Sequence, residues 1–232
     1  MNLKSNFSLA AIVPVYNEEQ FIKESLTSLL KIEEINTIFV IDDNSQDDSL
    51  IIIREIANEN SKVIIHSLSE NKGKGGAIKS IFHLIEEDYV IIHDADLEYN
   101  PRDIIKLYKE LDNTQESNFI IGSRLKTISN VKRYYRTFYA NKILSFLFSK
   151  IYKIKISDIA SCYKMMPTKF LKNNNFEENG FAIEVELISR YLKNNSNIVE
   201  VPITYEARSY KSGKKIKFID GFRYLIAMFK YR

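Results

Sequence analysis

Three acidic clusters stand in the first half of the chain, each directly after a run of apolar residues. They are Tyr16-Asn17-Glu18-Glu19, Asp42-Asp43-Asn44-Ser45 and Asp94-Ala95-Asp96-Leu97-Glu98. Like charges that are brought together repel one another, so gathered carboxylates indicate a bound cation or a hydrogen-bonding ligand. We therefore expect the chemistry of this protein where the three clusters meet.

The segment Asp94-Ala95-Asp96 has the clearest pattern for a metal ion. If the chain turns after the preceding apolar run, both carboxylates can reach one cation, with Glu98 as a third ligand. Hard divalent ions prefer oxygen ligands, and Mg²⁺ often takes one or two carboxylates together with substrate phosphates. The alternative is a solvated acidic turn. We predict a Mg²⁺ or Mn²⁺ site at Asp94, Asp96 and Glu98.

The other two clusters suit a nucleoside. A carboxylate in Asp42–Ser45 can accept hydrogen bonds from a ribose hydroxyl or a base N–H, and Tyr16 can stack on a base. The alternative is an Asx turn with Ser45 as a helix cap. The segment Asn71–Gly76 holds 3 of the 7 glycines. It either brings backbone N–H groups to a phosphate at a helix start or forms a flexible turn.

Cationic side chains after these clusters are the expected phosphate ligands, since arginine offers a two-pronged fork and lysine a point charge. They are Arg124, Arg208, Lys211, Lys214 and Lys215, and Ser209–Gly213 is a loop that could close over a diphosphate. The alternative for each is a solvated basic surface. Asp158 is a carboxylate that could orient or deprotonate an acceptor.

The elements that must position these side chains alternate in type. Apolar runs predict strands at residues 9–15, 37–41, 62–66, 89–93 and 118–121, and helical spacing predicts helices at 18–31, 46–58, 76–87 and 101–111. This order predicts a mostly parallel sheet with helices on both faces. Ligands bind beyond the carboxyl ends of such strands, where all three acidic clusters fall.

The second half is less regular. We predict helices over residues 131–153, 167–172, 181–192 and 218–231 and a strand over 198–203. The first and last of these helices combine aromatic and aliphatic residues with Lys and Arg, which is typical of helices at an anionic bilayer surface. The alternative is that their apolar faces fill the core or a dimer interface, so oligomerisation stays open. Without repeats or a linker, residues 1–232 are predicted to form one domain.

Composition adds a division by charge. The 232 residues are 45% hydrophobic and 27% charged, which excludes a low-complexity or disulfide-scaffold protein. Residues 1–126 carry 13 Lys and Arg against 22 Asp and Glu, a net −9, whereas residues 127–232 carry 20 against 8, a net +12. The basic half indicates an anionic partner, but the acidic half argues against nucleic acid. A single cysteine, Cys162, and a polar N-terminus predict a cytoplasmic location.

A series of short motifs runs in order along nearly the whole chain. They are Pro14-Val15-Tyr16-Asn17-Glu18-Glu19, Val40-Ile41-Asp42-Asp43-Asn44-Ser45, Asn71-Lys72-Gly73-Lys74-Gly75, Asp94-Ala95-Asp96-Leu97, Gly122-Ser123-Arg124, Ser157-Asp158, Asn179-Gly180-Phe181, Glu200-Val201-Pro202-Ile203 and Arg208. In this order and spacing they resemble the family 2 glycosyltransferases of GT-A fold, particularly the dolichyl-phosphate mannose synthase branch.

The resemblance implies an α/β GT-A fold: a Rossmann-like, mostly parallel sheet flanked by helices, with a basic, aromatic C-terminal extension of helices and a strand. Residues 1–126 would bind the nucleotide sugar and metal, and residues 127–232 the acceptor. It also implies roles for single residues. These are Pro14, Tyr16, Glu18, Ile41, Asp43, Asp94 and Ala95 at the nucleotide, Asp94, Asp96 and Glu98 at the metal, Arg124, Arg208 and Lys214 at the sugar and phosphates, and Asp96 and Asp158 in catalysis.

Two positions depart from the family pattern. Glu98 stands where relatives often carry Gln, which adds a charge beside the metal. Relatives usually carry Gly-Glu-Ser-Lys where this chain has Ser212-Gly213-Lys214-Lys215, so either lysine could be the phosphate ligand.

We expect a metal-dependent inverting glycosyltransferase that moves a sugar from a GDP- or UDP-sugar to a polyprenyl or dolichyl phosphate, as a peripheral protein at the inner face of the membrane. Mg²⁺ or Mn²⁺ would neutralise the diphosphate leaving group. The alternatives are transfer to a sugar hydroxyl of a glycan, with Asp158 as the base, and a sugar nucleotidyltransferase. A receiver-like metal-binding signalling domain is the non-enzymatic alternative.

Overall fold

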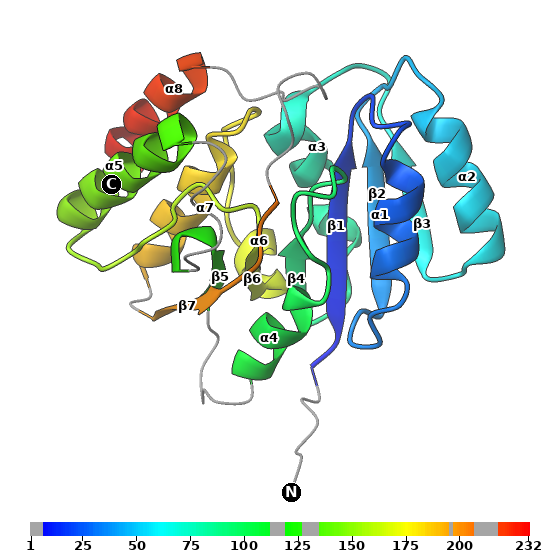
Figure 1. Ribbon diagram of the computed structural model, residues 1–232, viewed down its shortest axis with the longest axis horizontal. Coiled ribbons are helices and arrows are strands. Elements are labelled where there is room, and N and C mark those ends of the chain that lie inside the picture. Colours follow the sequence, from blue (N-terminus) through cyan, green and yellow to red (C-terminus); the bar gives the residue numbers. More distant parts are fainter. Residues whose placement is uncertain (1–6, 112–118, 127–134, 195–196, 207–217) are drawn as a thin grey trace, which may run out of the picture.

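The computed structural model describes residues 7–111, 119–126, 135–194, 197–206 and 218–232. Within them, seven strands form one sheet in the order β3-β2-β1-β4-β6-β5-β7 (Figure 1). The strands are β1 (Leu9–Val15), β2 (Thr37–Asp42), β3 (Val63–Ser67), β4 (Tyr89–Ile92), β5 (Phe119–Ser123), β6 (Lys164–Pro167) and β7 (Ile198–Pro202).

The sheet is mostly parallel, as predicted. β1 pairs in parallel with β2 and β4, β2 with β3, and β5 with β7. β6 is the exception, because it lies antiparallel between β4 and β5. The sequence pattern did not predict β6, since its four residues include Lys164, whose fully buried side chain forms an ion pair with Glu184 at 2.5 Å.

The helices flank this sheet. They are α1 (Ile22–Leu29), α2 (Ser49–Glu59), α3 (Gly73–Ser80), α4 (Asp103–Glu110), α5 (Tyr135–Tyr152), α6 (Thr168–Lys172), α7 (Ile183–Leu192) and α8 (Phe218–Lys230), with short 3₁₀ helices at Phe82–Leu84 and Arg124–Lys126. Each predicted helix has a counterpart in the structure, and most are shorter than predicted. The predicted helix at 76–87 corresponds to α3, which begins three residues earlier, and to the 3₁₀ helix at Phe82–Leu84.

Two local predictions were wrong. Helix α2 begins at Ser49, so Ser45 is not its cap; the Ser45 hydroxyl instead accepts a hydrogen bond from the Asn17 N–H at 3.1 Å. Helix α3 begins at Gly73 and ends at Ser80, so the Gly-rich segment lies inside the helix rather than before it. Glycine lowers helix propensity, and packing against another segment must compensate for it here.

Apolar side chains of β1, β2 and β4 form the centre of the core, where most of them are completely buried. Their continuous apolar runs follow from this burial, because helices cover a parallel sheet on both faces. The carboxyl ends of these strands meet at one edge of the sheet, and the acidic clusters follow directly from them.

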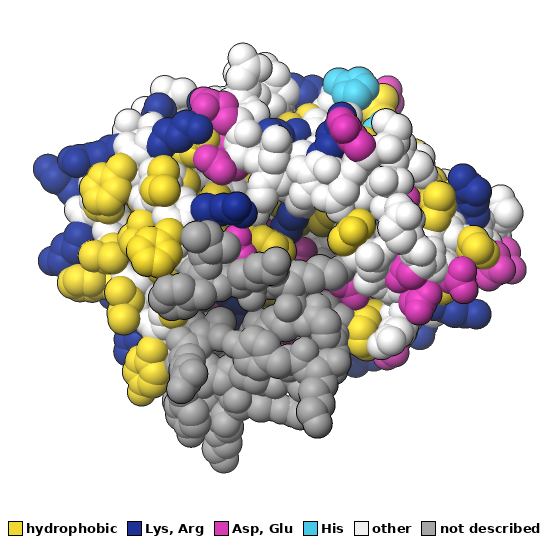
Figure 2. Space-filling model, turned by 90° about the horizontal axis from the view of Figure 1, so that it is seen from above, with side chains coloured by type: hydrophobic (Ala, Val, Ile, Leu, Met, Phe, Trp, Pro, Cys, Tyr) yellow, Lys and Arg dark blue, Asp and Glu magenta, His cyan; other side chains and the backbone are white. Residues whose placement is uncertain are grey.

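Helices α5 and α8 lie side by side at one end of the molecule and contact each other, for example through the Tyr152 hydroxyl, which donates to the Met228 carbonyl at 2.9 Å (Figure 1). Their outer faces expose large apolar side chains, and we call this set the α5–α8 apolar face. Its members are Tyr139, Ile143, Phe146, Leu147, Phe222, Ile226 and Phe229. Basic side chains surround it in Figure 2. Within the described residues, no helix has the length and apolar character needed to cross a bilayer.

Candidate active site

A cleft of about 440 Å³ opens at the carboxyl ends of the strands. It brings together side chains that are far apart in the sequence. Among the residues that line it are the predicted positions Pro14, Tyr16, Glu18, Asp43, Asp94, Ala95, Asp96, Glu98 and Arg124. The expectation that the three acidic clusters would share one edge of the sheet is therefore met by the fold.

Tight turns aim these clusters at the cleft. Asn17, Asn44 and Leu97 all have positive φ, at 51°, 60° and 60°, in the segments that follow β1, β2 and β4. Asparagine tolerates this left-handed region, whereas Leu97 is strained in it, at a cost of about 1–2 kcal/mol. The turn at Leu97 lies between Asp96 and Glu98, and the Glu98 N–H donates to the Asp96 carboxylate at 3.1 Å.

The carboxylate of Asp43 joins the β2 turn to the start of α3. It accepts hydrogen bonds from the N–H groups of Lys72 and Gly73 at 2.7 and 2.8 Å. Burial raises the pKa of Asp43, although these two hydrogen bonds act in the opposite direction. The N-terminus of α3 is thus occupied by a side chain of the protein, and Asp43 is fixed in the cleft wall.

The glycines of α3 allow a close approach to the segment before α7. A Cβ atom on Gly75 would lie 2.4 Å from the Glu178 carbonyl oxygen, and one on Gly73, which has a φ of +74°, would lie 2.7 Å from that of Asn179. The Gly76 N–H donates to the Asn179 carbonyl at 3.1 Å. In the structure the glycines therefore allow α3 to pack closely against the segment before α7. This packing brings Lys74 next to Glu184 of α7.

Lys74 forms two ion pairs at the floor of the cleft. Its ammonium lies 2.8 Å from Asp94 and 2.7 Å from Glu184. Burial alone would lower the pKa of Lys74, but the charges of Asp94 and Glu184 raise it well above its ordinary value. In turn, burial would raise the pKa of Asp94, but Lys74 holds it below the ordinary value. Both side chains are thus charged at neutral pH.

The predicted metal ligands occupy the same cleft but do not form a closed cage. Among the described residues, no three His, Cys, Asp or Glu side chains are grouped closely enough to enclose a metal ion. Asp94 is paired with Lys74, and Glu98 accepts a hydrogen bond from the Tyr205 hydroxyl at 2.5 Å. Carboxylates that supply a partial set of oxygen ligands fit a Mg²⁺ or Mn²⁺ ion whose remaining ligands are water and substrate phosphates.

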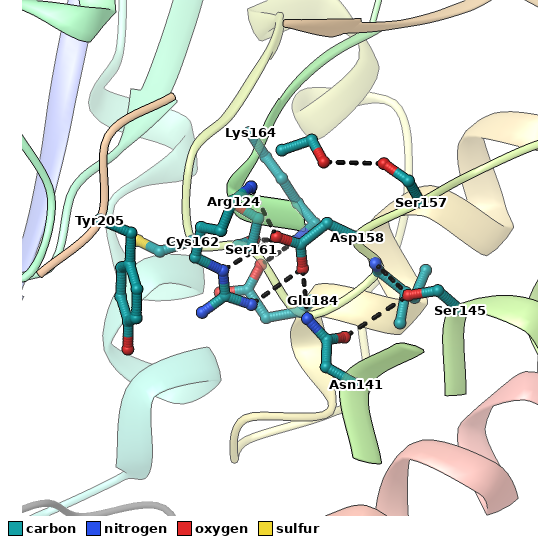
Figure 3. Close-up of polar contacts among 12 residues, drawn as sticks. Arg124, Asn141, Ser145, Ser157, Asp158, Ser161, Cys162, Lys164, Glu184 and Tyr205 are labelled. Carbon is teal, nitrogen blue, oxygen red and sulfur yellow. Dashed lines mark hydrogen bonds and ion pairs between the residues drawn. The ribbon is translucent and has the colours of Figure 1, made fainter. Parts of the chain in front are cut away.

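Arg124 directly follows β5 and lines the cleft. Its guanidinium contacts the Asp158 carboxylate (Figure 3). Its Nε and Nη2 atoms donate to the two carboxylate oxygens of Asp158 at 2.9 and 2.8 Å. Its guanidinium also lies over the rings of Tyr205 and Tyr99, at 5.0 and 5.8 Å from their centroids. A two-pronged ion pair and two aromatic faces fix the orientation of this cation.

Asp158 itself does not line the cleft, because its side chain is completely buried behind Arg124. Its carboxylate accepts four hydrogen bonds, three from Arg124 and one from Asn141. Burial would raise its pKa, but the charge and hydrogen bonds of Arg124 and the hydrogen bond of Asn141 hold it below the ordinary value. This geometry favours a structural role over the predicted role as a base.

One further predicted residue does not line the cleft. Ile41 is completely buried in β2 and belongs to the core. Arg208 and Lys214 lie outside the described residues, as do Lys211, Lys215 and the predicted loop 209–213.

The cleft also contains residues that were not singled out as site residues from the sequence, among them Lys74, Glu184, Tyr99 and Tyr205. Lys74 lies inside the Gly-rich segment that was considered as a phosphate loop, which is the one signal that could have found it. Glu184 falls on an amphipathic helix, where an acidic residue predicts a solvated face. Tyr99 and Tyr205 form an isolated bridge between two loops, and nothing local in the sequence indicates that pairing.

Comparison with known proteins identifies the family. The model described as "Glycosyl transferase family 2" matches residues 10–174. An uncharacterised protein of Methanocaldococcus jannaschii is 31% identical over 221 residues, which cover 90% of this chain and 94% of that protein. A UDP-N-acetylglucosamine–dolichyl-phosphate N-acetylglucosaminyltransferase of Methanococcus voltae is 28% identical, over 94% of this chain and 94% of that protein. The dolichol-phosphate mannosyltransferase of Saccharomyces cerevisiae is 27% identical, over 89% of this chain and 82% of that protein.

The fold agrees with these relatives. The glucosyl-3-phosphoglycerate synthase of Mycobacterium tuberculosis, solved with Mn²⁺, UDP and glucosyl-3-phosphoglycerate, superimposes with a TM-score of 0.75 at 16% identity, over 98% of this chain and 81% of that one. At this identity the likeness concerns the fold, and it confirms the predicted GT-A architecture. From the family model, the relatives and the fold together, this chain belongs to glycosyl transferase family 2 and is a glycosyltransferase of its dolichol-phosphate mannosyltransferase-like branch.

Proposed function

We propose that this glycosyltransferase moves a sugar from a UDP- or GDP-sugar to a polyprenyl phosphate at the membrane surface. The observation that carries the proposal is the order of charged groups along the cleft. Asp43 follows β2, Asp94 and Asp96 follow β4, and Arg124 follows β5. In the sheet, β1 and β4 separate β2 from β6 and β5. Asp43 and Arg124 therefore belong to opposite ends of the cleft.

This order suits the two substrates. At the Asp43 end, Tyr16 and Pro14 offer an aromatic and an apolar surface for a nucleoside, and Asp43 offers an acceptor for its N–H or hydroxyl groups. In the middle, Asp94 and Asp96 would hold Mg²⁺ or Mn²⁺. When bound, that ion neutralises the diphosphate leaving group. At the far end, Arg124 supplies a positive charge for a second phosphate.

A phosphate acceptor also fits the state of Asp158. A sugar hydroxyl must lose its proton during transfer and needs a general base. A phosphate monoester is already ionised at neutral pH and needs none. Because Asp158 is buried and accepts four hydrogen bonds, it is poorly suited to take a further proton. An ionised acceptor that attacks from the face opposite the diphosphate would invert the anomeric carbon.

The α5–α8 apolar face supports delivery of the acceptor from a bilayer. Phe146 is 59% exposed and Ile226 is 63% exposed, on two adjoining helices. The exposed Lys142 and Lys150 on α5 and Arg223 on α8 accompany them, and such a mixture binds anionic lipid surfaces. In this proposal the protein is peripheral at the cytoplasmic face of the membrane, with α5 and α8 against the lipid.

The decisive experiment is a transfer assay with radiolabelled UDP- and GDP-sugars, a polyprenyl phosphate in mixed micelles, and Mg²⁺, Mn²⁺ or EDTA. We expect organic-soluble labelled product, free nucleoside diphosphate and no turnover in EDTA. Asp96→Asn should lower turnover at least about a hundredfold, as expected when a group that stabilises the leaving charge is lost. The matched control Glu55→Gln, on the exposed surface of α2, should keep wild-type turnover.

Other outcomes would identify the alternatives. Release of pyrophosphate instead of nucleoside diphosphate would indicate a sugar nucleotidyltransferase. Transfer to a glycan hydroxyl with no lipid-linked product would reject the phosphate acceptor. Full activity of Asp96→Asn, or full activity in EDTA, would reject the metal assignment.

A further inference from the structure

Helix α5 has two chemically different faces. One belongs to the α5–α8 apolar face. The other carries Asn141, Ser145 and Ser149, which are spaced four residues apart and therefore lie on one side of the helix. Each of them makes hydrogen bonds to the short segment 156–159, which includes Asp158. Figure 3 shows Asn141 and Ser145 beside Asp158. We call these three residues the polar stripe of α5.

The hydrogen bonds of the polar stripe go to two kinds of partner, the backbone of segment 156–159 and the side chain of Asp158. The Ser149 hydroxyl donates to the Ile156 carbonyl at 3.0 Å and accepts from the Ile156 N–H at 3.1 Å. The Ser145 hydroxyl accepts from the Ile159 N–H at 3.0 Å. Only Asn141 among the three bonds to the Asp158 side chain, through its amide at 2.6 Å to Oδ1. Ser145 and Ser149 thus fix backbone, and Asn141 fixes the carboxylate.

The oxygen that Asn141 contacts is also the one that receives Arg124. Oδ1 of Asp158 accepts from Nη2 of Arg124 at 2.8 Å. Asn141 and Asp158 are both at least nine-tenths buried, with 7% and 0% of their surfaces exposed. Rotation of the carboxylate about χ2 would break its hydrogen bonds to Asn141 and Arg124. Because the guanidinium bonds to both carboxylate oxygens, the plane of the carboxylate also sets the plane of the guanidinium.

From these contacts we infer that helix α5 positions Arg124 through Asn141 and Asp158, and that Asn141 is a positioning residue for the acceptor phosphate. The assignment of the acceptor rests on the proposed function; the positioning itself does not. The helix that exposes Ile143 and Phe146 is thereby joined, through the Asn141 amide and the Asp158 carboxylate, to the Arg124 guanidinium in the cleft.

The first test reads the Arg124 side chain directly and needs no substrate. Exchange of its Nε–H with solvent can be followed by NMR in ¹⁵N-arginine-labelled protein, with the signal assigned from Arg124→Lys. In Asn141→Ala and Asn141→Leu we expect exchange to be faster by about tenfold, since a hydrogen bond to a charged group is lost. Asn141→Leu keeps the number and branching of the side-chain heavy atoms but removes the amide, so it tests the loss of the hydrogen bond without leaving a cavity.

Ser149→Ala is the matched control. It removes the two hydrogen bonds that Ser149 makes to Ile156, between the same helix and the same segment, but it leaves the hydrogen bonds of Asp158 in place. We expect it to lower the melting temperature as the Asn141 variants do, with Arg124 Nε–H exchange within about twofold of wild type. Equal acceleration in Ser149→Ala, or none in the Asn141 variants, would overturn the inference.

The second test uses farnesyl phosphate and inorganic phosphate as probes, with binding measured by calorimetry in the absence of nucleotide and metal. Asn141→Ala should weaken farnesyl phosphate binding about tenfold, and it should have no further effect in the Arg124→Lys background. Additive effects of the two substitutions would contradict positioning. If wild-type protein binds neither probe, the proposed phosphate acceptor fails, while the exchange measurement still decides the role of Asn141.

Discussion

Asp158 is a buried carboxylate, and its negative charge is stabilised by neighbouring hydrogen-bond donors. Arg124 and Asn141 together donate four hydrogen bonds to it. Such a carboxylate contributes to stability through its ionised form, because the pKa is held below its ordinary value in the folded chain. A group with a lowered folded-state pKa stabilises the protein above its unfolded-state pKa, and this contribution is lost as the pH falls through the folded-state value.

Asp158→Asn should therefore destabilise the protein in a pH-dependent manner. At pH 7 we expect the free energy of unfolding to fall by about 3 kcal/mol, because Arg124 loses its buried partner. The difference should shrink as the pH falls below the unfolded-state pKa of an aspartate, about 3.9, and the two proteins should converge only below the lowered folded-state pKa of Asp158. Urea denaturation across this pH range measures the difference. A difference that stays constant with pH would show that the charge of Asp158 is not what stabilises the fold.

At the level of single residues, the sequence indicated most of the cleft but not its internal pairing. Asp43, Asp94 and Asp96 could be predicted because each directly follows an apolar strand, and strand ends share an edge. Lys74 and Glu184 could not be paired in advance, since they come from helices α3 and α7, which are far apart in the sequence and are brought together only by tertiary packing. Asp158 was found as a residue, but its role depends on Arg124 and Asn141, which only the packing of α5 brings to it.

The packing of helix α3 requires a residue without a side chain at position 75. Gly75 lies so close to the Glu178 carbonyl that a Cβ atom would be 2.4 Å away. Gly75→Ala should lower the free energy of unfolding by about 1–3 kcal/mol, the usual cost of overpacking a well-packed site. It should also displace the neighbouring Lys74 and so weaken nucleotide binding.

Gly221→Ala is the control for this prediction. A Cβ atom at Gly221 meets nothing within 4 Å, and Ala is favoured over Gly inside a helix such as α8 by about 1 kcal/mol. Thermal denaturation of both variants should therefore give shifts of opposite sign. A stabilising Gly75→Ala would mean that α3 and the segment before α7 are not in tight contact.

Helices α5 and α8 make a prediction about lipid. Phe146→Glu combined with Ile226→Glu should reduce flotation with vesicles that contain anionic lipid by more than about tenfold, because each buried side chain of this size contributes about 1.5–3 kcal/mol. Ile51→Glu is the matched control, since Ile51 is 56% exposed but lies on α2. It should float as wild type does. If the double variant floats normally but changes from dimer to monomer in size-exclusion chromatography, the face is a dimer interface instead.

Element types followed from the sequence wherever periodicity was strong. The strands at 9–15 and 37–42 consist mainly of apolar residues, and the predictions at 9–15 and 37–41 match them almost to the residue. Boundaries were less accurate where glycine or serine suggested a turn: α3 continues through three glycines because their lack of side chains is needed for packing. β6 was missed because tertiary pairing, with β4 and β5, defines it.

The sheet as a whole spans the division of charge. β1 to β5 come from the acidic residues 1–126, while β6 and β7 come from the basic residues 127–232. β6 nevertheless lies between β4 and β5, and β5 has β6 and β7 as its neighbours. The nucleotide-binding and acceptor-binding portions inferred from charge are therefore parts of a single sheet.

A fragment of residues 1–126 should consequently fail to fold alone. Without β6, β4 exposes one edge and β5 has no neighbouring strand, and unpaired edges favour aggregation. We expect the fragment to lack cooperative thermal unfolding by circular dichroism, and addition of a fragment of residues 127–232 should restore it at least partly. A cooperative transition of the 1–126 fragment by itself would contradict this expectation.

The insertion of β6 also has a consequence for synthesis of the chain. β4 ends at Ile92, and β6 begins only at Lys164. At about 5–20 residues per second, the ribosome needs roughly 4–14 seconds to make the intervening segment. Throughout that interval the nascent protein presents an unpaired edge of one of its most apolar strands. Chaperone contact during translation should thus concentrate on chains that extend beyond β4 but have not yet released β6.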